Sequence, residues 1–316
     1  MRNRTKLLLM TGVSVLFIIL YLFYDLNGSY SYALPRRGVK VVAMLITGAA
    51  IAYATVVFQT ITHNRILTPS IMGLDSLYQL LQTALIFMLG STHIALINKQ
   101  VNFFLSTALM IGFALVLYHL LFRKGNQPIY FLLLVGIVIG TFFGSISTFM
   151  QVLIDPNEFL RIQDRMFASF NNVGTDLVWI ALVLTVLVLF WSWRSHHYLD
   201  VVSLGRDTAI NLGVPYDSLV RKMLIVSAIL IAISTALVGP ITFFGLIVAN
   251  LSYQFMKSYK HNLLVLSAML MSFIALVGGQ FIVERVFQFS TTLSVIINFI
   301  GGIYFIYLLL KESRSK

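Results

Sequence analysis

The chain has 316 residues, of which 59% are hydrophobic and only 10% charged, and its formal net charge at pH 7 is +11. It has no cysteine, which excludes disulfides, thiolate metal ligands and cysteine nucleophiles. A chain this apolar and this poor in charge is not composed like a soluble globular domain, and it is predicted to cross a membrane many times.

Ten apolar runs follow one another along the chain, each long enough or nearly long enough to span a bilayer. A hydrocarbon core about 30 Å thick needs about 20 helical residues. Lipid cannot satisfy backbone polar groups and the runs do not alternate in polarity, so we expect an all-α polytopic membrane protein rather than a barrel. The expected spans are residues 7–24, 40–61, 71–91, 101–122, 128–153, 176–193, 223–239, 241–256, 262–281 and 293–310.

The positions of the 22 lysines and arginines predict the orientation. If the N-terminus is cytoplasmic, fifteen of them fall inside and seven outside, which agrees with the positive-inside rule and places both termini in the cytoplasm. The basic charge then indicates contact with an anionic inner leaflet rather than with nucleic acid. The seven outer residues are Arg36, Arg37, Lys40, Lys99, Arg161, Arg165 and Arg285.

Little of the chain lies outside these runs, so residues 1–316 are interpreted as one integral-membrane domain. The longer polar segments are residues 25–37 and 155–174 outside and about 195–222 inside. Within the last, Gly213 is placed to end a short helix in a left-handed conformation, and Pro215 to start the next helix. This cytoplasmic segment is predicted to be a docking surface.

Residues in this segment and elsewhere are typical of one transporter family. The segment contains Leu204-Gly205, Ala209 and Leu212-Gly213-Val214, and residues 239–246 read Gly-Pro-Ile-Thr-Phe-Phe-Gly-Leu. The chain resembles the FecCD family, the permeases of iron-chelate and vitamin B12 class (type II) ABC importers, whose corresponding segment reads Gly-Pro-Ile-Gly-Phe-Val-Gly-Leu. The resemblance runs in colinear order from about residue 34 to 310. It also includes Gly48, Ala52, Gln59, Asn64, Pro69, Gly73 and, more weakly, Leu34-Pro35-Arg36 and Gly301-Gly302.

Several positions depart from the family pattern. Arg65 replaces a proline, Thr55 a glycine, Ala249-Asn250 a Pro-His pair and Ile303 a proline. These changes affect helix geometry rather than the resemblance as a whole. Together with residues 283–287 and 296–299, the combination is most similar to permeases of catecholate-type siderophore systems such as petrobactin. The implied cargo is a ferric siderophore, with haem or a corrinoid as alternatives.

The resemblance implies an ABC importer subunit whose ATPase is a separate chain, because no phosphate-binding Gly-x-x-x-x-Gly-Lys-Ser/Thr loop is present. It also implies that the cytoplasmic segment sits in a groove of that ATPase and transmits its closure. The alternative is that its glycines only terminate helices in a solvated loop. The implied coupling residues are Leu204, Gly205, Ala209, Leu212 and Gly213.

The resemblance further implies a path for the chelate between two permease subunits, either identical or paralogous, lined by the fifth and tenth spans. Gly136, Gly140 and Gly144 recur every four residues in the fifth span, which favours close packing against another helix, either within the chain or in the second subunit. Serine and threonine hydroxyls in these spans can line the path or bond to their own helix backbone. The implied path residues are Ser145, Thr148, Thr292 and Asn298.

Outward-facing arginines are implied to dock an extracytoplasmic siderophore-binding protein, because guanidinium groups pair well with carboxylates. The candidates are Arg36, Arg37 and Arg285. An alternative for Arg285 is that the adjacent Glu284 satisfies it at the membrane surface.

A secondary transporter or a polytopic membrane enzyme is the alternative class of function. Either would normally carry ionisable groups in mid-membrane, and here Asp75, Glu284, His93 and His119 all lie near the ends of spans. Adjacent histidines on a helix point about 100° apart, so His196-His197 is interpreted as a polar edge and not a metal site. We therefore expect a multi-pass permease of the cytoplasmic membrane, with no catalytic residue and no cofactor.

Overall fold

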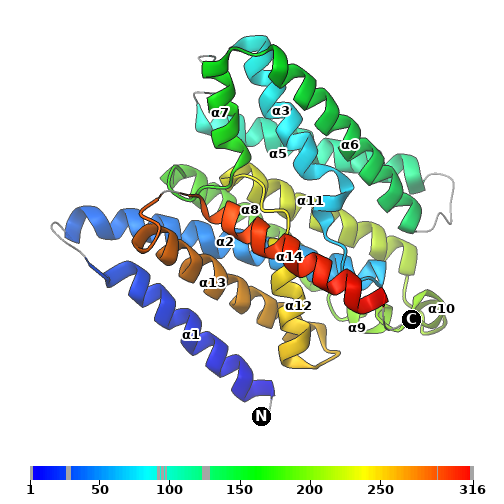
Figure 1. Cartoon of the computed structure of the whole chain (residues 1–316). Helices are drawn as coiled ribbons and strands as arrows, with labels where there is room; N and C mark the ends of the chain where they lie inside the picture. The colour runs from blue at the N-terminus through cyan, green and yellow to red at the C-terminus, as the bar shows by residue number, and fades with distance from the viewer. Residues whose placement is uncertain are drawn as a thin grey trace.

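The computed structural model describes residues 3–25, 30–90, 93, 96, 98–122, 129–289 and 291–313. Its regular elements in these residues are all helices, with no β-strand among them, which confirms the predicted all-α fold (Figure 1). The helices are α1 (Asn3–Phe23), α2 (Tyr30–Thr62), the 3-10 helix η1 (Pro69–Met72), α3 (Leu74–Leu89), α5 (Lys99–Phe122), α6 (Ile129–Leu153), α7 (Pro156–Met166), α8 (Thr175–Trp193), α9 (Tyr198–Val202), α10 (Arg206–Asn211), α11 (Tyr216–Val238), α12 (Phe244–Met256), α13 (His261–Arg285) and α14 (Leu293–Ser313).

Each predicted run corresponds to one apolar helix. Eight of these helices, counted in the described residues, are long and apolar enough to cross a membrane, namely α1, α2, α5, α6, α8, α11, α13 and α14. The other two, α3 and α12, have 16 and 13 residues, because the α-helical conformation is interrupted just before each of them. Before α3 the interruption is η1 with Gly73 at φ +83°, and before α12 it is Gly239 at φ +100° followed by Pro240. The chain is a multi-pass membrane protein, and the number of ten membrane spans remains a prediction.

The centre of the bundle is α2, which packs against α11 and α13. Small side chains on α2 allow this close approach, and Ala43, Ala50 and Ala54 are completely buried. A Cβ at Gly48 would lie 2.6 Å from Ser272 Oγ on α13, so only glycine fits there without a shift. By contrast α1, α6 and α14 cover little of their apolar surface within the chain, and that surface is available to lipid or to another subunit.

Lysine side chains make contacts at both ends of the bundle. Figure 1 shows α7 at one end and α9 and α10 at the other. At the α7 end Lys40 pairs with Glu284 and Lys99 donates to a carbonyl at residue 172. At the α10 end Lys222 donates to Ser195. Which end faces the cytoplasm remains a prediction.

Two elements differ from the sequence-based expectation. Helix α2 begins at Tyr30, ten residues before the expected span, and accommodates Pro35 within its first two turns, where the missing N–H disturbs few helix bonds. The polar segment 155–174 contains a helix, α7. The Asp155 side chain caps it by accepting from the Asn157 N–H at 2.8 Å, and Pro156 occupies its first position.

Candidate functional site

Two glycines on α6 lie directly against η1. A Cβ at Gly136 would lie 2.8 Å from the Cα of Met72, and one at Gly140 would lie 3.0 Å from the Cα of Gly73. A Cβ at Gly144, one turn further along, would have no neighbour within 4 Å. Packing within the chain therefore explains the first two glycines, and the third leaves the surface of α6 open.

A groove of about 750 Å³ runs along this part of α6. Ser145 and Thr148 line it from α6, and Ser70 and Ser76 line it from η1 and α3. The hydroxyls of Ser145 and Thr148 donate to carbonyl oxygens four residues earlier, each at 2.9 Å, so both bond to their own helix. Their oxygens keep lone pairs that can accept weak hydrogen bonds from a passing molecule.

A second cavity, of about 290 Å³, adjoins the groove, since Ser70, Ile71 and Ser76 line both. Asn298 of α14 lines this cavity, and its Oδ1 atom is buried without a hydrogen-bond partner among the described residues. Asp75 lines it as well. The predicted path residues on α6 and α14 thus reach two adjoining polar cavities on either side of η1.

Thr292, the fourth predicted path residue, lines neither cavity. Its Oγ1 lies 3.2 Å from Ser294 Oγ, next to the start of α14. Conversely, Ser70, Asp75 and Ser76 line the cavities although none was predicted to do so from the sequence. The available signal was their polarity at the beginning of an otherwise apolar run.

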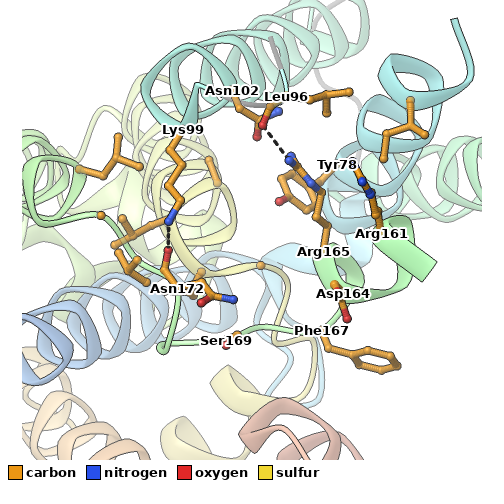
Figure 2. Close-up of a pocket in the computed structure, with 18 residues that line it drawn as sticks. Tyr78, Leu96, Lys99, Asn102, Arg161, Asp164, Arg165, Phe167, Ser169 and Asn172 are labelled. Atoms are coloured by element: carbon orange, nitrogen blue, oxygen red, sulfur yellow. Dashed lines mark hydrogen bonds between the residues drawn. The ribbon is translucent and has the colours of Figure 1, made fainter. Parts of the chain in front are cut away.

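A cavity of about 440 Å³ at the α7 end lies between α3, α5, α7 and the chain that follows α7 (Figure 2). Arg165 at the end of α7 donates to Gln82 Oε1 at 2.8 Å and to the carbonyl of Leu96 at 2.9 Å. Across the cavity Lys99 Nζ donates to the carbonyl of Asn172 at 2.7 Å. Burial lowers the pKa of Arg165, but a guanidinium stays protonated at any physiological pH. Arg165 also lines the cavity that contains Asn298, so the end of α7 borders both cavities.

The three arginines predicted to dock a partner differ in their contacts. Arg36 is exposed, and its guanidinium lies 4.3 Å over the ring of Tyr32 without a hydrogen bond in the described part of the chain. Arg37 donates to backbone carbonyls at the end of α1, including that of Tyr24 at 2.8 Å, and so caps that helix. Arg285 pairs with the carboxylate of Asp25. Arg36 therefore has the most accessible guanidinium of the three.

Glu284 does not satisfy Arg285, which corrects the alternative considered above. Its carboxylate lies 3.1 Å from Lys40 Nζ and accepts from Tyr21 at 2.7 Å and from Gln280 at 2.9 Å. These contacts join α1, α2 and α13. Lys40 also donates to Asn171 Oδ1 at 2.8 Å, which ties the chain after α7 to the same cluster.

Helix α10 at the opposite end has the predicted glycine terminator. Gly213 has φ +82°, its N–H donates to the carbonyl of Ile210, and the next N–H, of Val214, donates to that of Ala209. This pair of bonds is the Schellman motif. Ala209 is fully buried, whereas Leu204 and Leu212 are 63% and 62% exposed. Two exposed leucines that flank this short helix are apolar groups suited to contact with a partner.

The neighbouring helix α9 is bonded to the bundle by a partly buried network. Asp200 Oδ1 accepts from the backbone N–H of His261 at 2.7 Å and lies 2.6 Å from its Nδ1. His261 Nε2 lies 2.8 Å from Thr60 Oγ1 on α2. A displacement of α9 would therefore act directly on α2 and α13.

The two adjacent histidines face different surroundings. His196 is buried with its ring 5.9 Å from that of Tyr53, whereas His197 is exposed and lies 4.1 Å from the ring of Tyr198. Burial lowers the pKa of His196, which keeps its imidazole neutral at pH 7.

Comparisons with known proteins show the family to which the sequence is similar. The model of the FecCD transport family matches residues 6–311. The petrobactin import system permease protein YclO of Bacillus subtilis (strain 168) is 59% identical over the full length of both chains. The corresponding protein FatC of Bacillus anthracis is 37% identical and covers 90% of this chain and 80% of its own length.

One solved structure has the same fold. It is an inward-facing conformation of a metal-chelate type ABC transporter, and it superposes with a TM-score of 0.84 over 98% of this chain and 99% of its own. Its sequence is only 21% identical, so the likeness concerns the fold.

Proposed function

This chain belongs to the FecCD transport family, and we propose that it is the permease subunit of an ABC importer that carries a ferric siderophore across the cytoplasmic membrane. The observation that carries the proposal is the 59% identity, without truncation of either chain, to a permease named for petrobactin import. Petrobactin, or a chelate of closely similar chemistry, is accordingly the proposed cargo. The chain itself is a transport subunit and not an enzyme.

The proposed route follows the groove of α6 and the adjoining cavity that contains Asn298. Its hydroxyl and amide groups bind weakly, which suits a conduit because tight binding along a path retards release. The exposed apolar surfaces of α6 and α14 would face a second permease subunit. Whether that subunit is a second copy or a paralogue is an outcome of purifying the complex.

The proposed partners occupy the two ends. An ABC ATPase would dock on α10, where the exposed Leu204 and Leu212 flank a helix terminated by Gly213. A siderophore-binding protein would dock at the α7 end, with Arg36 as the principal contact. The contacts of Arg37 and Arg285 with the end of α1 support a structural part for these two residues, which shape the docking face without supplying its free charge.

Uptake of radioactive iron by cells lacking the gene tests the proposal. Deletion should abolish uptake of ferric petrobactin and spare uptake of a ferric hydroxamate, and the intact gene should restore it. Normal petrobactin uptake in the deletion strain would reject the proposed cargo. Loss of haem-dependent or corrinoid-dependent growth with normal siderophore uptake would transfer the function to that chelate.

A further inference from the structure

A small enclosed cavity lies behind the wall of the proposed route, where α2, α3, α11, α12 and η1 meet. Its volume of about 10 Å³ is that of a single water-sized species. One carboxylate and several hydroxyls line it, which is unusual for the interior of a membrane bundle. The polar residues that line it are Thr55, Thr68, Ser70, Asp75, Thr235 and Thr242.

The carboxylate belongs to Asp75 in the first turn of α3. Thr242 Oγ1 donates to its Oδ2 at 3.2 Å, and the hydroxyls of Ser70 and Thr235 lie against it as well. No salt bridge to Asp75 occurs in the described part of the chain, because the nearby Arg165 is directed to Gln82 and Leu96. The positive end of α3 and the three hydroxyls favour the ionised carboxylate, whereas its complete burial opposes ionisation unless a positive charge is bound beside it.

A second, independent observation is the hydroxyl of Thr55. This side chain is completely buried, and its Oγ1 has no hydrogen-bond partner among the described residues. The space around it depends on a glycine, since a Cβ at Gly245 would lie 2.1 Å from Thr55 Oγ1. A buried hydroxyl with no hydrogen-bond partner is costly unless a bound species satisfies it. The cavity therefore contains both an unsatisfied hydroxyl and a carboxylate without a salt bridge in the described part of the chain.

The ligand set defines the species that would satisfy both groups. All the ligating atoms are hard oxygens, which exclude metals that prefer nitrogen or sulfur. One carboxylate matches a single positive charge, whereas a divalent ion in a buried site would leave a charge uncompensated. The volume admits one small ion. We propose that Asp75 together with the hydroxyls of Thr55, Thr235 and Thr242 binds one small monovalent cation, with sodium as the probe of choice.

The position of this site relates it to transport. Asp75, Ser70 and Thr242 also line the cavity that contains Asn298, so a bound cation would sit directly behind the wall of the route. It would neutralise the carboxylate nearest to the passing chelate and hold η1, α3 and α11 together. The site stands on its own geometry and does not depend on which chelate is carried.

Thermal unfolding of the purified full-length chain in detergent tests the site. At constant ionic strength, replacing N-methyl-D-glucamine with sodium should raise the unfolding midpoint in a saturable way. Asp75→Asn keeps the size of the side chain and should abolish the sodium-dependent rise, and Thr55→Val should increase the sodium concentration needed for it. Thr47→Val is the matched control, because Thr47 lies on α2, is equally buried and also has an unpartnered Oγ1, but lines none of the cavities considered. Its sodium response should match the wild type.

Equal midpoints for the wild type in sodium and in N-methyl-D-glucamine would overturn the proposal. So would a midpoint that depends on pH but not on sodium, since Asp75 would then be protonated and the cavity would hold water. If Asp75→Asn fails to fold, equilibrium binding of radioactive sodium to the wild type decides the question. Saturable binding of one ion per chain supports the site, and no saturable binding rejects it.

Discussion

Side-chain contacts hold several helices together at the α7 end of the molecule, whereas at the α10 end they hold α9 and the backbone shapes the end of α10 itself. At the α7 end Lys40 and Glu284 join α1, α2 and α13, and Arg165 separately bonds α7 to α3. At the α10 end the short helix is flanked by glycines at positive φ, its Arg206 pairs with Asp217 of α11 at 3.7 Å, and the flanking Leu204 and Leu212 are exposed. The exposed leucines beside α10 support the proposal that a partner docks at that end, and the ionic contacts at the α7 end support a structural part for it.

The largest effect should come from placing charge on the two exposed leucines that flank α10. Leu204→Glu combined with Leu212→Glu would force carboxylates into the proposed ATPase contact, where unpaired charge is strongly unfavourable. We expect the ATPase to be lost from the purified complex and siderophore uptake to fall at least about tenfold, the equivalent of about 1.4 kcal/mol. The exposed polar neighbour Asn211 supplies the control, and Asn211→Asp should retain both. Normal co-purification of the double variant would remove α10 from the interface.

Stability should respond more strongly at the other end. Glu284→Gln keeps the shape of the side chain but leaves Lys40 without its counter-charge in a half-buried cluster. We expect the free energy of unfolding to fall by about 1–3 kcal/mol, seen as a lower thermal midpoint, with ATPase association unchanged. Asp176→Asn, an exposed acid in the first turn of α8, should shift the midpoint less. An equal shift of the thermal midpoint for both variants would mean that the Lys40–Glu284 cluster stabilises the protein no more than an exposed acid does.

A smaller and more local effect is expected at Gly213. A Cβ there meets no atom within 4 Å, so the φ of +82° alone opposes substitution, at about 1–2 kcal/mol. Gly213→Ala should weaken ATPase association a few-fold while leaving the protein in the membrane. Gly302→Ala is matched, since it also has open space but an ordinary helical backbone, and it should be neutral. Identical ATPase association for the two variants would show that the backbone at Gly213 does not shape the docking surface.

The smallest expected effect is kinetic and concerns Arg36. Reversing its charge with Arg36→Glu should slow association of the binding protein a few-fold at low salt and leave thermal stability unchanged. Arg37→Gln should lower the thermal stability and leave the association rate of the binding protein unchanged, because Arg37 caps α1. Surface binding and thermal unfolding of both variants separate the two roles. Unchanged association for Arg36→Glu would leave this residue as an interface anchor.

The fold was largely predictable from the sequence, because a long apolar segment in lipid must satisfy its backbone hydrogen bonds internally and therefore forms a helix. Gly213 as a helix terminator was predictable for the same kind of reason, since a local backbone requirement is visible in the residue type. The polar cavities were not, because Ser70, Asp75 and Asn298 come from segments far apart in the chain. The sequence also did not predict that Arg36 is exposed while Arg37 bonds to the end of α1, since this depends on where α1 ends in space.

The route along α6 can be tested directly because the chain has no cysteine and any introduced thiol is unique. Thr148→Cys places a thiol in the groove, and Val183→Cys places one on the exposed apolar face of α8, outside the cavities. We expect a charged, membrane-impermeant thiol reagent to modify only the first variant and to stop its ferric siderophore uptake. Equal reactivity of the two thiols, or full uptake after complete modification at position 148, would contradict a path along α6.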